Sequence, residues 1–334
     1  MEKHGRALVV RLDSAGDVLL AGPAVRAVAA TAHVTLLCGP AGEHAGRLLP
    51  GVDDLLGWLC PWIVADPPPV AGPEVTALVD AVRAARPDVA LILTSFHQSP
   101  LPLALLLRLA GVPEIAAISV DYPGSLLDHR LPDVDLPEPE RALTVAGAAG
   151  FSLPAGDTGE LRVRTPPDVS HLVGHGHVVV HPGATAPARA PSPHRSRAFV
   201  DALVEHGHRV VVTGGESEPT AEVAGTRALD LGGRTTFAEL AGVLATAQAV
   251  VVGNTATAHL AAAVGTPVVS LFAPVVPAGR WAPYRVPHVL LGDQDAPCAG
   301  SRARVCPVPG HPCLDRVSTT QVLAAVDSMA RAAA

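Results

Sequence analysis

Aromatic and basic side chains are scarce in this chain of 334 residues. Phe, Trp and Tyr together make up 3% of the residues, and Lys3 is the only lysine among 24 basic residues. The formal net charge is −7. A nucleic-acid-binding protein needs a basic surface for phosphates and aromatic rings for bases, so this composition argues against that class of partner.

The chain also lacks an uninterrupted apolar run that would cross a membrane. The best candidate, 240–279, has no Asp, Glu, Lys or Arg, but polar residues, glycines and prolines break it before about 20 apolar residues accumulate. No secretion signal is visible, because Ala7–Val10 leads straight into a charged turn. Five cysteines, an odd number, favour reduced thiols. We expect a cytoplasmic protein, with at most a peripheral contact at the inner face of the membrane.

Short β-branched runs alternate with loops that carry Gly or Pro and with Ala/Leu-rich stretches of helical periodicity. Hydrophobic residues make up 49% of the chain, which is enough for two cores at this length. The alternation predicts βαβ units and a parallel sheet in each half. The predicted strands lie within 7–12, 33–38, 88–93, 177–183, 208–216, 249–254 and 266–274, and the helices within 24–32, 76–85, 195–207, 235–247 and 257–265.

The alternation fades between Asp121 and Pro167, where proline and polar residues dominate, and this segment is interpreted as the connection between two domains. We expect an N-terminal domain over 1–165, a C-terminal domain over 166–317 and a terminal helix over 318–334, for which packing back on the N-terminal domain is one option. Doubly wound sheets bind ligands outside the carboxyl ends of their strands, so the site is expected in a cleft between the domains.

Three loops of the second half follow predicted strands and carry residues that suit a phosphate. In HPGATAPAR (181–189), Gly183 allows close backbone approach, Thr185 offers a hydroxyl and Arg189 offers a guanidinium for bidentate contact. In GNTATAH (253–259), the start of a helix offers free N–H groups and hydroxyls.

The remaining loop, TGGESE (213–218), has two glycines for a tight turn, and Glu216 or Glu218 could accept hydrogen bonds from ribose hydroxyls. Such turns are common for structural reasons alone, but three in consecutive βα units favour a site for a nucleotide diphosphate. The chain lacks both the GxGxxG fingerprint and the GxxxxGK(S/T) P-loop. A nucleotide that acts as a leaving group is therefore favoured over a hydride carrier or a triphosphate.

Several clusters of potential metal ligands occur, and for each a structural explanation is favoured. Four histidines lie near a predicted strand without an acidic or cysteine partner. Two Asp-x-Asp pairs, a spacing that can hold Mg²⁺, lie in loops with prolines. Three cysteines and a histidine have gaps that fit no standard zinc module, and a redox role is the alternative to zinc. These residues are His171, His175, His177 and His181; Asp133 and Asp135; Asp293 and Asp295; and Cys298, Cys306, Cys313 and His311.

The turn RLDSAGDVLLAGP (11–23) places two carboxylates, Asp13 and Asp17, between a predicted strand and a predicted helix. Asp17 has two interpretations that stay open on chemistry alone: a general base at the end of a strand, or an acid that caps the helix. Asp13 is expected to be a solvated loop residue. Pro23 favours an irregular first turn.

These segments resemble the motifs of glycosyltransferase family 9, the heptosyltransferase family. GDVLLAGP (16–23) is similar to its GDxxxxxP element, and HPGATAPAR is similar to its HPGxxxPxK loop. GNTATAHLAAAVGTPVVSLFAP (253–274) is similar to its GNTGPAHLAAAxGTPVVxLFGP block, and WAPY (281–284) continues that block. CPVPGHPCL (306–314) resembles CPLGHHxCL, so the likeness spans both halves of the chain.

The resemblance implies an α/β fold of the GT-B type, with two Rossmann-like, doubly wound domains that face a central cleft. The donor would bind the C-terminal domain and the acceptor the N-terminal one. The implied reaction is an inverting transfer of a heptose or related sugar from ADP- or GDP-heptose, without a metal or other cofactor. The acceptor would be a hydroxyl of a glycan, a lipid-linked glycan or a natural product, and a monomer is expected.

The resemblance also implies roles for individual residues. The catalytic base of the family falls on Asp17, its phosphate-binding lysine on Arg189, and the basic residue before the turn on Arg11. The other implied positions are Ser14, Gly16, Thr185, Thr255 and Ala256 near the donor phosphates, Glu218 and Thr235 at the nucleoside, and Asn254, Thr257 and His259 at the sugar.

Two departures from the family pattern concern the donor. Many members have an acidic residue in a GNDTGPAHL version of the last loop, where this chain has Asn254 followed by Thr-Ala-Thr, and the Trp that often follows the phosphate lysine is absent. Two alternatives stay open: a nucleotide-sugar epimerase or hydrolase of the same fold, and a nucleotide-sugar-binding protein without catalysis. The second is favoured if Asp17 is buried and capped rather than facing the cleft.

Overall fold

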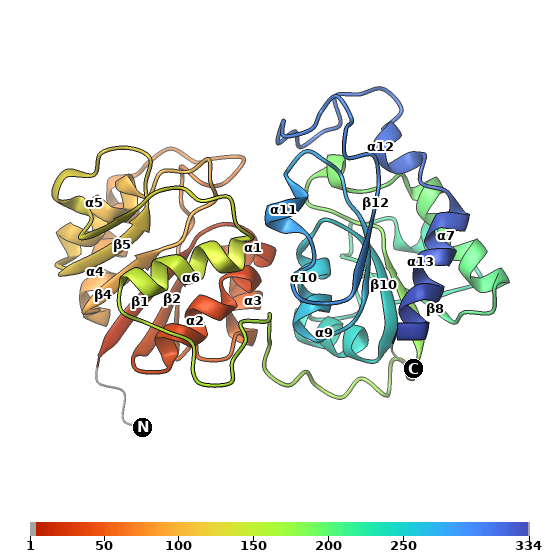
Figure 1. The fold of residues 1–334 in the computed structure, drawn as a ribbon, viewed down its shortest axis with the longest axis horizontal. Coiled ribbons are helices and arrows are strands. Elements are labelled where there is room, and N and C mark those ends of the chain that lie inside the picture. The colour runs from red at the N-terminus through yellow and green to blue at the C-terminus, as the bar shows by residue number, and fades with distance from the viewer. Residues whose placement is uncertain (1–4, 333–334) are drawn as a thin grey trace. The chain divides into compact units, whose positions relative to one another are not determined.

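The computed structural model describes residues 5–332 and divides into two compact units, Met1–Arg164 and Thr165–Ala334 (Figure 1). Each unit has its own six-stranded sheet, and helices connect the successive strands. Every neighbouring pair of strands is parallel. The predicted alternation of strands and helices is confirmed in both halves of the chain.

The sheet of the first unit has the strand order β3-β2-β1-β4-β5-β6. The central strands are almost wholly buried, as expected for strands covered on both faces, whose sequences read as continuous apolar runs. The strands are β1 (Arg6–Arg11), β2 (His33–Cys38), β3 (Asp54–Gly57), β4 (Val89–Ile92), β5 (Glu114–Ile118) and β6 (His129–Leu131).

The sheet of the second unit, β12-β11-β10-β7-β8-β9, repeats this topology. Counted from the first strand of its unit, each sheet has the doubly wound order 3-2-1-4-5-6, so ligands are expected at the carboxyl ends of the two central strands. The strands are β7 (His177–His181), β8 (Val210–Val212), β9 (Leu229–Asp230), β10 (Ala247–Gly253), β11 (Val268–Leu271) and β12 (His288–Leu291).

The helices begin and end at residues with recognisable capping chemistry. Thr236 and Glu239 form the predicted capping box of α9, and Gly207 and Gly265 adopt positive φ angles just after α7 and α10. The helices of the first unit are α1 (Ala15–Leu20), α2 (Gly22–Ala29), α3 (Glu43–Leu48), α4 (Gly72–Ala85), α5 (Leu101–Ala110) and α6 (Glu138–Ala148). Those of the second are α7 (Pro193–Glu205), α8 (Thr220–Ala224), α9 (Phe237–Ala245), α10 (Ala256–Ala263), α11 (Ala278–Trp281), α12 (Pro312–Asp315) and α13 (Thr319–Ala332), and short 3₁₀ turns are η1 (Pro40–Gly42), η2 (Gly124–Leu126) and η3 (Pro187–Arg189).

The interpretation of 121–167 as an interdomain connection is wrong for its first half. This part contains β6 and α6, and α6 packs against α1, α2 and the strands β4, β5 and β6. Pro137 and Pro139 looked like linker residues, but they are the N-cap and a first-turn residue of α6, where proline is favoured because its missing N–H has no helical partner.

The segment that follows α6 is irregular and is tied to the first unit by two arginines. Arg26 Nε donates to Asp157 Oδ2 at 2.6 Å, and Arg164 Nη2 donates to the carbonyl oxygen of Val52 at 2.6 Å. The hydrogen bond from Arg26 lowers the pKa of Asp157 to about 2. The first unit therefore extends to Arg164.

The terminal helix α13 contributes to the core of the second unit. Val322, Val326 and Met329 are buried in the same cluster as Phe199 of α7. α13 contacts α7 and the strands β10, β11 and β12. The sequence offered no sign of this packing, and the suggested contact of this helix with the first unit stays a prediction.

Candidate active site

The turn after β1 brings its two acids to the carboxyl end of a central strand. Ser14 is the N-cap of α1 and forms a capping box with Asp17, whose Oδ2 accepts from Ser14 Oγ at 2.7 Å and from Ser14 N at 3.4 Å. The capping interpretation of Asp17 is thus confirmed. Its side chain nevertheless stays 16% exposed, so capping and contact with a substrate are compatible.

Arg11, the last residue of β1, holds Asp17 from the other side. Arg11 Nη2 donates to Asp17 Oδ1 at 2.9 Å and to Ser95 Oγ at 3.0 Å. The same guanidinium forms ion pairs with Asp13 at 3.0 Å and with Glu138 at 3.3 Å. Burial alone would lower the pKa of Arg11, but the attraction of these three carboxylates outweighs it and raises that pKa above its ordinary value.

The expectation that Asp13 is a solvated loop residue is wrong. Its side chain is only 11% exposed, and besides Arg11 it accepts a short hydrogen bond from Gln98 Nε2. Burial raises the pKa of Asp13 to about 6, against the lowering effect of Arg11, and the charge of Asp17 adds to the rise. The sequence could not indicate this, because the loop that covers Asp13 comes 85 residues later.

Two residues of α6, which sequence reasoning missed, complete this group. Glu138 Oε1 accepts from Arg141 Nη1 at 2.7 Å, and Arg141 Nη2 donates to Asp133 Oδ1 at 2.7 Å. Glu138 and Arg141 are both buried. We name Arg11, Asp13, Asp17, Asp133, Glu138 and Arg141 the acid cluster; it joins four carboxylates to two guanidinium groups.

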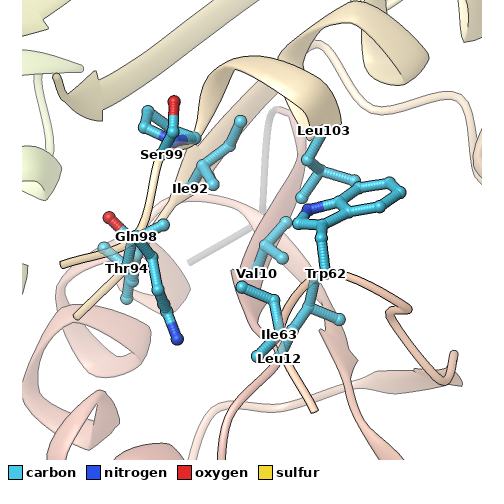
Figure 2. Close-up of a pocket in the computed structure, with 11 residues that line it drawn as sticks. Val10, Leu12, Trp62, Ile63, Ile92, Thr94, Gln98, Ser99 and Leu103 are labelled. Atoms are coloured by element: carbon cyan, nitrogen blue, oxygen red, sulfur yellow. The ribbon is translucent and has the colours of Figure 1, made fainter. Parts of the chain in front are cut away.

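A small hollow opens beside the acid cluster at the carboxyl ends of β1 and β4 (Figure 2). Gln98 belongs to both features, since its side chain lines the hollow and donates to Asp13. The lining is mainly apolar and comes from both central strands, the loop after β3 and the start of α5. The residues are Val10, Leu12, Trp62, Ile63, Ile92, Leu93, Thr94, Gln98, Ser99, Pro100 and Leu103.

In the second unit, the structure brings two of the predicted nucleotide loops together. A Cβ atom on Gly183 would lie 1.9 Å from the carboxyl carbon of Glu218, so only glycine leaves room for that carboxylate between the loops after β7 and β8. Glu218 Oε2 accepts from the backbone N–H of Gly215 at 2.9 Å. Of the two glutamates considered for the ribose, Glu218 is the one that contacts the first loop.

His181 connects all three loops. The sequence favoured a purely structural role for it, as a histidine that flanks a strand. Its Nδ1 is hydrogen-bonded to Thr213 Oγ1 at 2.9 Å and its Nε2 to Thr257 Oγ1 at 3.2 Å. Glu218 Oε2 lies 3.8 Å from Nε2. Burial lowers the pKa of His181, although Glu218 opposes that shift, so the ring is mainly neutral near pH 7. The HPG motif was the signal that could have found it.

The third loop places the N-terminus of α10 beside His181. Thr255 is the N-cap of α10, and its hydroxyl is buried without a hydrogen-bond partner among residues 5–332. Ala256 is the first residue of that helix, and His259 is buried one turn further on. The N–H groups at this end and the Thr255 hydroxyl are suited to phosphate oxygens.

Asn254 has a structural role that the sequence did not reveal. Its Nδ2 donates to the carbonyl oxygen of Ala273 at 3.5 Å, and its Oδ1 accepts from the N–H of Ala273 at 3.4 Å. The amide therefore joins the ends of β10 and β11. Thr257 contacts His181 instead, so two of the three residues predicted to bind the sugar have different local partners.

Arg189 and Thr185 lie on a loop that packs closely over β10. A Cβ atom on Gly253 would lie 2.2 Å from the carbonyl oxygen of Arg189. The cysteine-containing segment covers the same loop, because Ala188 N donates to the carbonyl oxygen of Arg304 at 2.9 Å. The loop that phosphate would contact is thus held from two sides.

Thr235 precedes the N-cap residue of α9 and is half-buried. The turn before it meets the second nucleotide loop, since the N–H of Gly233 donates to the carbonyl oxygen of Gly214 at 2.9 Å. Thr235 lies two residues after Gly233 in the chain, and its role at the nucleoside stays a prediction.

Among residues 5–332, no three His, Cys, Asp or Glu side chains are grouped so that they could hold a metal ion. Cys298 and Cys313 are buried in the core of the second unit, and Cys306 packs against it. Over the same residues no helix is both long and apolar enough to span a bilayer.

Three solved structures are similar to this chain over nearly its whole length. An ADP-heptose lipopolysaccharide heptosyltransferase II of Escherichia coli has a TM-score of 0.74 at 18% identity, with 98% of this chain and 99% of that one covered. A family 9 glycosyl transferase of Veillonella parvula has a TM-score of 0.76 at 17% identity, covering 99% and 98%. An Escherichia coli heptosyltransferase determined with ADP has a TM-score of 0.67 at 18% identity, covering 98% of each. The fold is therefore GT-B.

Sequence comparison covers a smaller part of the chain but identifies a family. The chain is 33% identical over 108 residues to lipopolysaccharide heptosyltransferase 3 of Escherichia coli, and this match spans 30% of the chain and 32% of that relative. The family model for glycosyltransferase family 9 (heptosyltransferase) matches residues 118–311, from the end of the first unit through most of the second. The chain belongs to glycosyltransferase family 9, the heptosyltransferase family.

Proposed function

We propose that this protein transfers a heptose or a closely related sugar from a nucleotide-diphosphate donor to a hydroxyl of an acceptor, with inversion at the anomeric carbon. ADP-heptose is the leading donor, because one similar structure is named for ADP-heptose and another was determined with ADP. The acceptor is a glycan, a lipid-linked glycan or a natural product. We expect it to act as a monomer in the cytoplasm, with at most a peripheral contact at the inner face of the membrane.

In the proposed step, the carboxylate of Asp17 takes the proton of the acceptor hydroxyl. The hydroxyl oxygen attacks the anomeric carbon and forms the new glycosidic bond, while the bond from that carbon to the phosphate oxygen breaks. The nucleoside diphosphate leaves with the electron pair. Arg11 and Ser14 orient Asp17, because they bind its two oxygens from different sides.

The observation that carries the proposal is the convergence of three loops around His181 in a chain of this family. The N-terminus of α10 and Arg189 supply N–H groups and charge for the diphosphate. Glu218, held between Gly183 and Gly214, would accept from the ribose hydroxyls. The leaving nucleotide would thereby be bound by groups on the rigid ends of β7, β8 and β10.

The test is the Asp17→Asn substitution, which keeps the size of the side chain and removes the base. We expect the transfer rate with ADP-heptose and a verified acceptor to fall about a hundredfold or more. Calorimetry should show ADP binding largely unchanged, because most of the proposed nucleotide residues lie in the second unit and Ser14 and Gly16 are not altered. Transfer near the wild-type rate would refute the role of Asp17.

The matched control is Glu43→Gln, which neutralises another first-turn acid of the same unit, in α3. It should leave transfer unchanged. Turnover of the donor without any acceptor would instead favour the epimerase or hydrolase alternative. Donor binding without turnover under all conditions would favour a binding protein. A panel of ADP-, GDP- and UDP-sugars, scored by the rise in melting temperature, would identify the nucleotide.

A further inference from the structure

We propose that the hollow beside the acid cluster binds an apolar group of the acceptor, either an aryl ring or a short alkyl chain, and that the acceptor carries no phosphate next to its reacting hydroxyl. This inference rests on the proposed function. It adds the chemical class of the acceptor, which the family membership leaves open.

The first argument is the chemistry of the lining. Figure 2 shows Trp62, Ile63 and Leu12 on one side of the hollow and the polar Thr94 and Gln98 on the other. No Lys, Arg, Asp or Glu is among the lining residues. Such a surface gains free energy when it removes apolar ligand atoms from water, and it offers no charge to bind an anion.

The second argument is the position of the polar side of the hollow. Gln98 connects the hollow to the acid cluster. Its Oε1 accepts from the N–H of Ser95 at 3.0 Å, and its Nε2 donates to Asp13. Ser95 Oγ in turn accepts from Arg11, which holds Asp17. A ligand with an apolar body in the hollow would thus have its polar end toward the acid cluster, which contains the proposed base.

The third argument is charge. The acid cluster has four carboxylates against two guanidinium groups, so it stays net negative even when Asp13 holds a proton. A phosphate beside it would meet repulsion in partly buried surroundings. In the proposed function the donor diphosphate binds the N–H groups of α10, Arg189 and the turn with Ser14 and Gly16, none of which lines the hollow, so the hollow is left for the acceptor.

The hollow is open and of modest size. Its empty space of about 260 Å³ includes open solvent at its mouth, so the enclosed part is much smaller and the hollow is a shallow depression in the surface. Ser99 at its edge is exposed, and the two loops that form it carry further exposed apolar side chains, Leu59 (48%) and Phe96 (37%).

The test uses methyl, butyl and hexyl β-D-glucopyranoside as probes of the wild-type protein, without donor. Each added methylene should tighten binding about three- to fourfold until the hollow is filled. Calorimetry measures the affinities. The emission of Trp62, observed alone after Trp58→Phe and Trp281→Phe, should shift to shorter wavelength as the alkyl group covers the ring. Equal affinities of the methyl and hexyl probes would overturn the proposal.

The decisive variant is Ser99→Trp, which places a large side chain at the opening and changes no buried residue. It should abolish the dependence of affinity on chain length. Its control, Ser152→Trp, adds the same side chain at another exposed serine of this unit that does not line the hollow, and should keep the dependence. A dependence that survives Ser99→Trp would also overturn the proposal.

The outcomes separate this inference from the proposed function. Transfer to a purely polar acceptor, together with equal probe affinities, would leave the reaction standing and refute the apolar site. Graded probe binding that Ser99→Trp removes would support the apolar site even in a protein that transfers no sugar.

Discussion

Asp13 and Asp17 share the guanidinium of Arg11 and differ in their surroundings. Asp17 accepts from the hydroxyl and N–H of Ser14, and its side chain remains partly exposed. Asp13 is covered by the loop that contains Gln98, and burial raises its pKa to about 6. When Asp13 holds a proton, its negative charge no longer repels the carboxylate of Asp17, and the attraction of Arg11 for Asp17 is less offset. The protonation of Asp13 therefore affects the acid proposed as the base.

The stability of the protein should depend on Asp13 in a defined direction. The folded state holds this proton up to about pH 6, whereas the unfolded chain releases it near the ordinary pKa of 3.8. Between these values the folded state binds more protons, so stability falls as the pH rises. Relative to Asp13→Asn, wild type should lose on the order of 1–3 kcal/mol of unfolding free energy between about pH 4 and pH 7.

Urea denaturation of both proteins at the two pH values measures this loss. At each pH the difference in unfolding free energy between wild type and Asp13→Asn includes a constant effect of the substitution. Only the change of this difference between the two pH values reports the titration of Asp13. A difference that stays constant would show that Asp13 does not titrate in this range.

At the scale of elements, α6 acts on the site from far away in the sequence. Glu138 reaches Arg11, and Arg141 connects Glu138 to Asp133 and to the carbonyl oxygen of Thr94 after β4. The side chains of Glu138 and Arg141 are buried, so each charge needs its ion-pair partners, including Arg11, to offset the loss of hydration. The helix therefore fixes the acid cluster as well as covering the sheet.

Removing one of these partners should be strongly destabilising. Arg141→Met leaves Glu138 and Asp133 without their guanidinium, and loss of a buried partner lowers the unfolding free energy by about 3–5 kcal/mol. Arg83→Met is the matched control, because Arg83 pairs with Asp80 on the exposed surface of α4 and should lose less than about 1 kcal/mol. Denaturation followed by the fluorescence of Trp58 and Trp62 compares the two; losses of equal size would refute the contribution of the buried pair.

Periodicity and loop motifs were sufficient to predict the central elements. The predicted strands β1, β2, β4, β7, β8, β10 and β11 and the predicted helices α2, α4, α7, α9, α10 and α13 have strong apolar patterns, and the three nucleotide loops follow directly from strand ends. The elements β3, β5, β12, α3, α5 and α8 were not predicted. The segment with β6 and α6 was missed because its prolines indicate a linker when tertiary contacts are unknown. Asp13, His181 and Glu138 were missed or misjudged for the same reason, since long-range partners determine their burial.

At the scale of the whole molecule, one topology occurs twice, and each copy has its own core. The first unit contains the acid cluster and the hollow, and the second contains the loops proposed for the nucleotide. Each unit has the sheet, the helices and the buried apolar side chains that an independent folding unit needs. A ligand of one unit should therefore stabilise that unit first.

ADP is expected to raise the unfolding temperature of the second unit and to leave that of the first unchanged. Trp58 and Trp62 report on the first unit after Trp281→Phe, and Trp281 reports on the second after Trp58→Phe and Trp62→Phe. At about 100 times the dissociation constant, ADP should add about 2.7 kcal/mol to the stability of the second unit. Equal shifts in both reporters would show that the units unfold together or that ADP binds elsewhere.

The long sequence separation within the acid cluster bears on how the protein is synthesised. Arg11 leaves the ribosome more than a hundred residues ahead of its partner Glu138. At about 5–20 residues per second, the strand must wait many seconds with its arginine in water before α6 arrives to cover it. Such distant pairings form late. The proposed base thus acquires its final surroundings only when the first unit is essentially complete, and a nascent chain that stops before α6 has no working site.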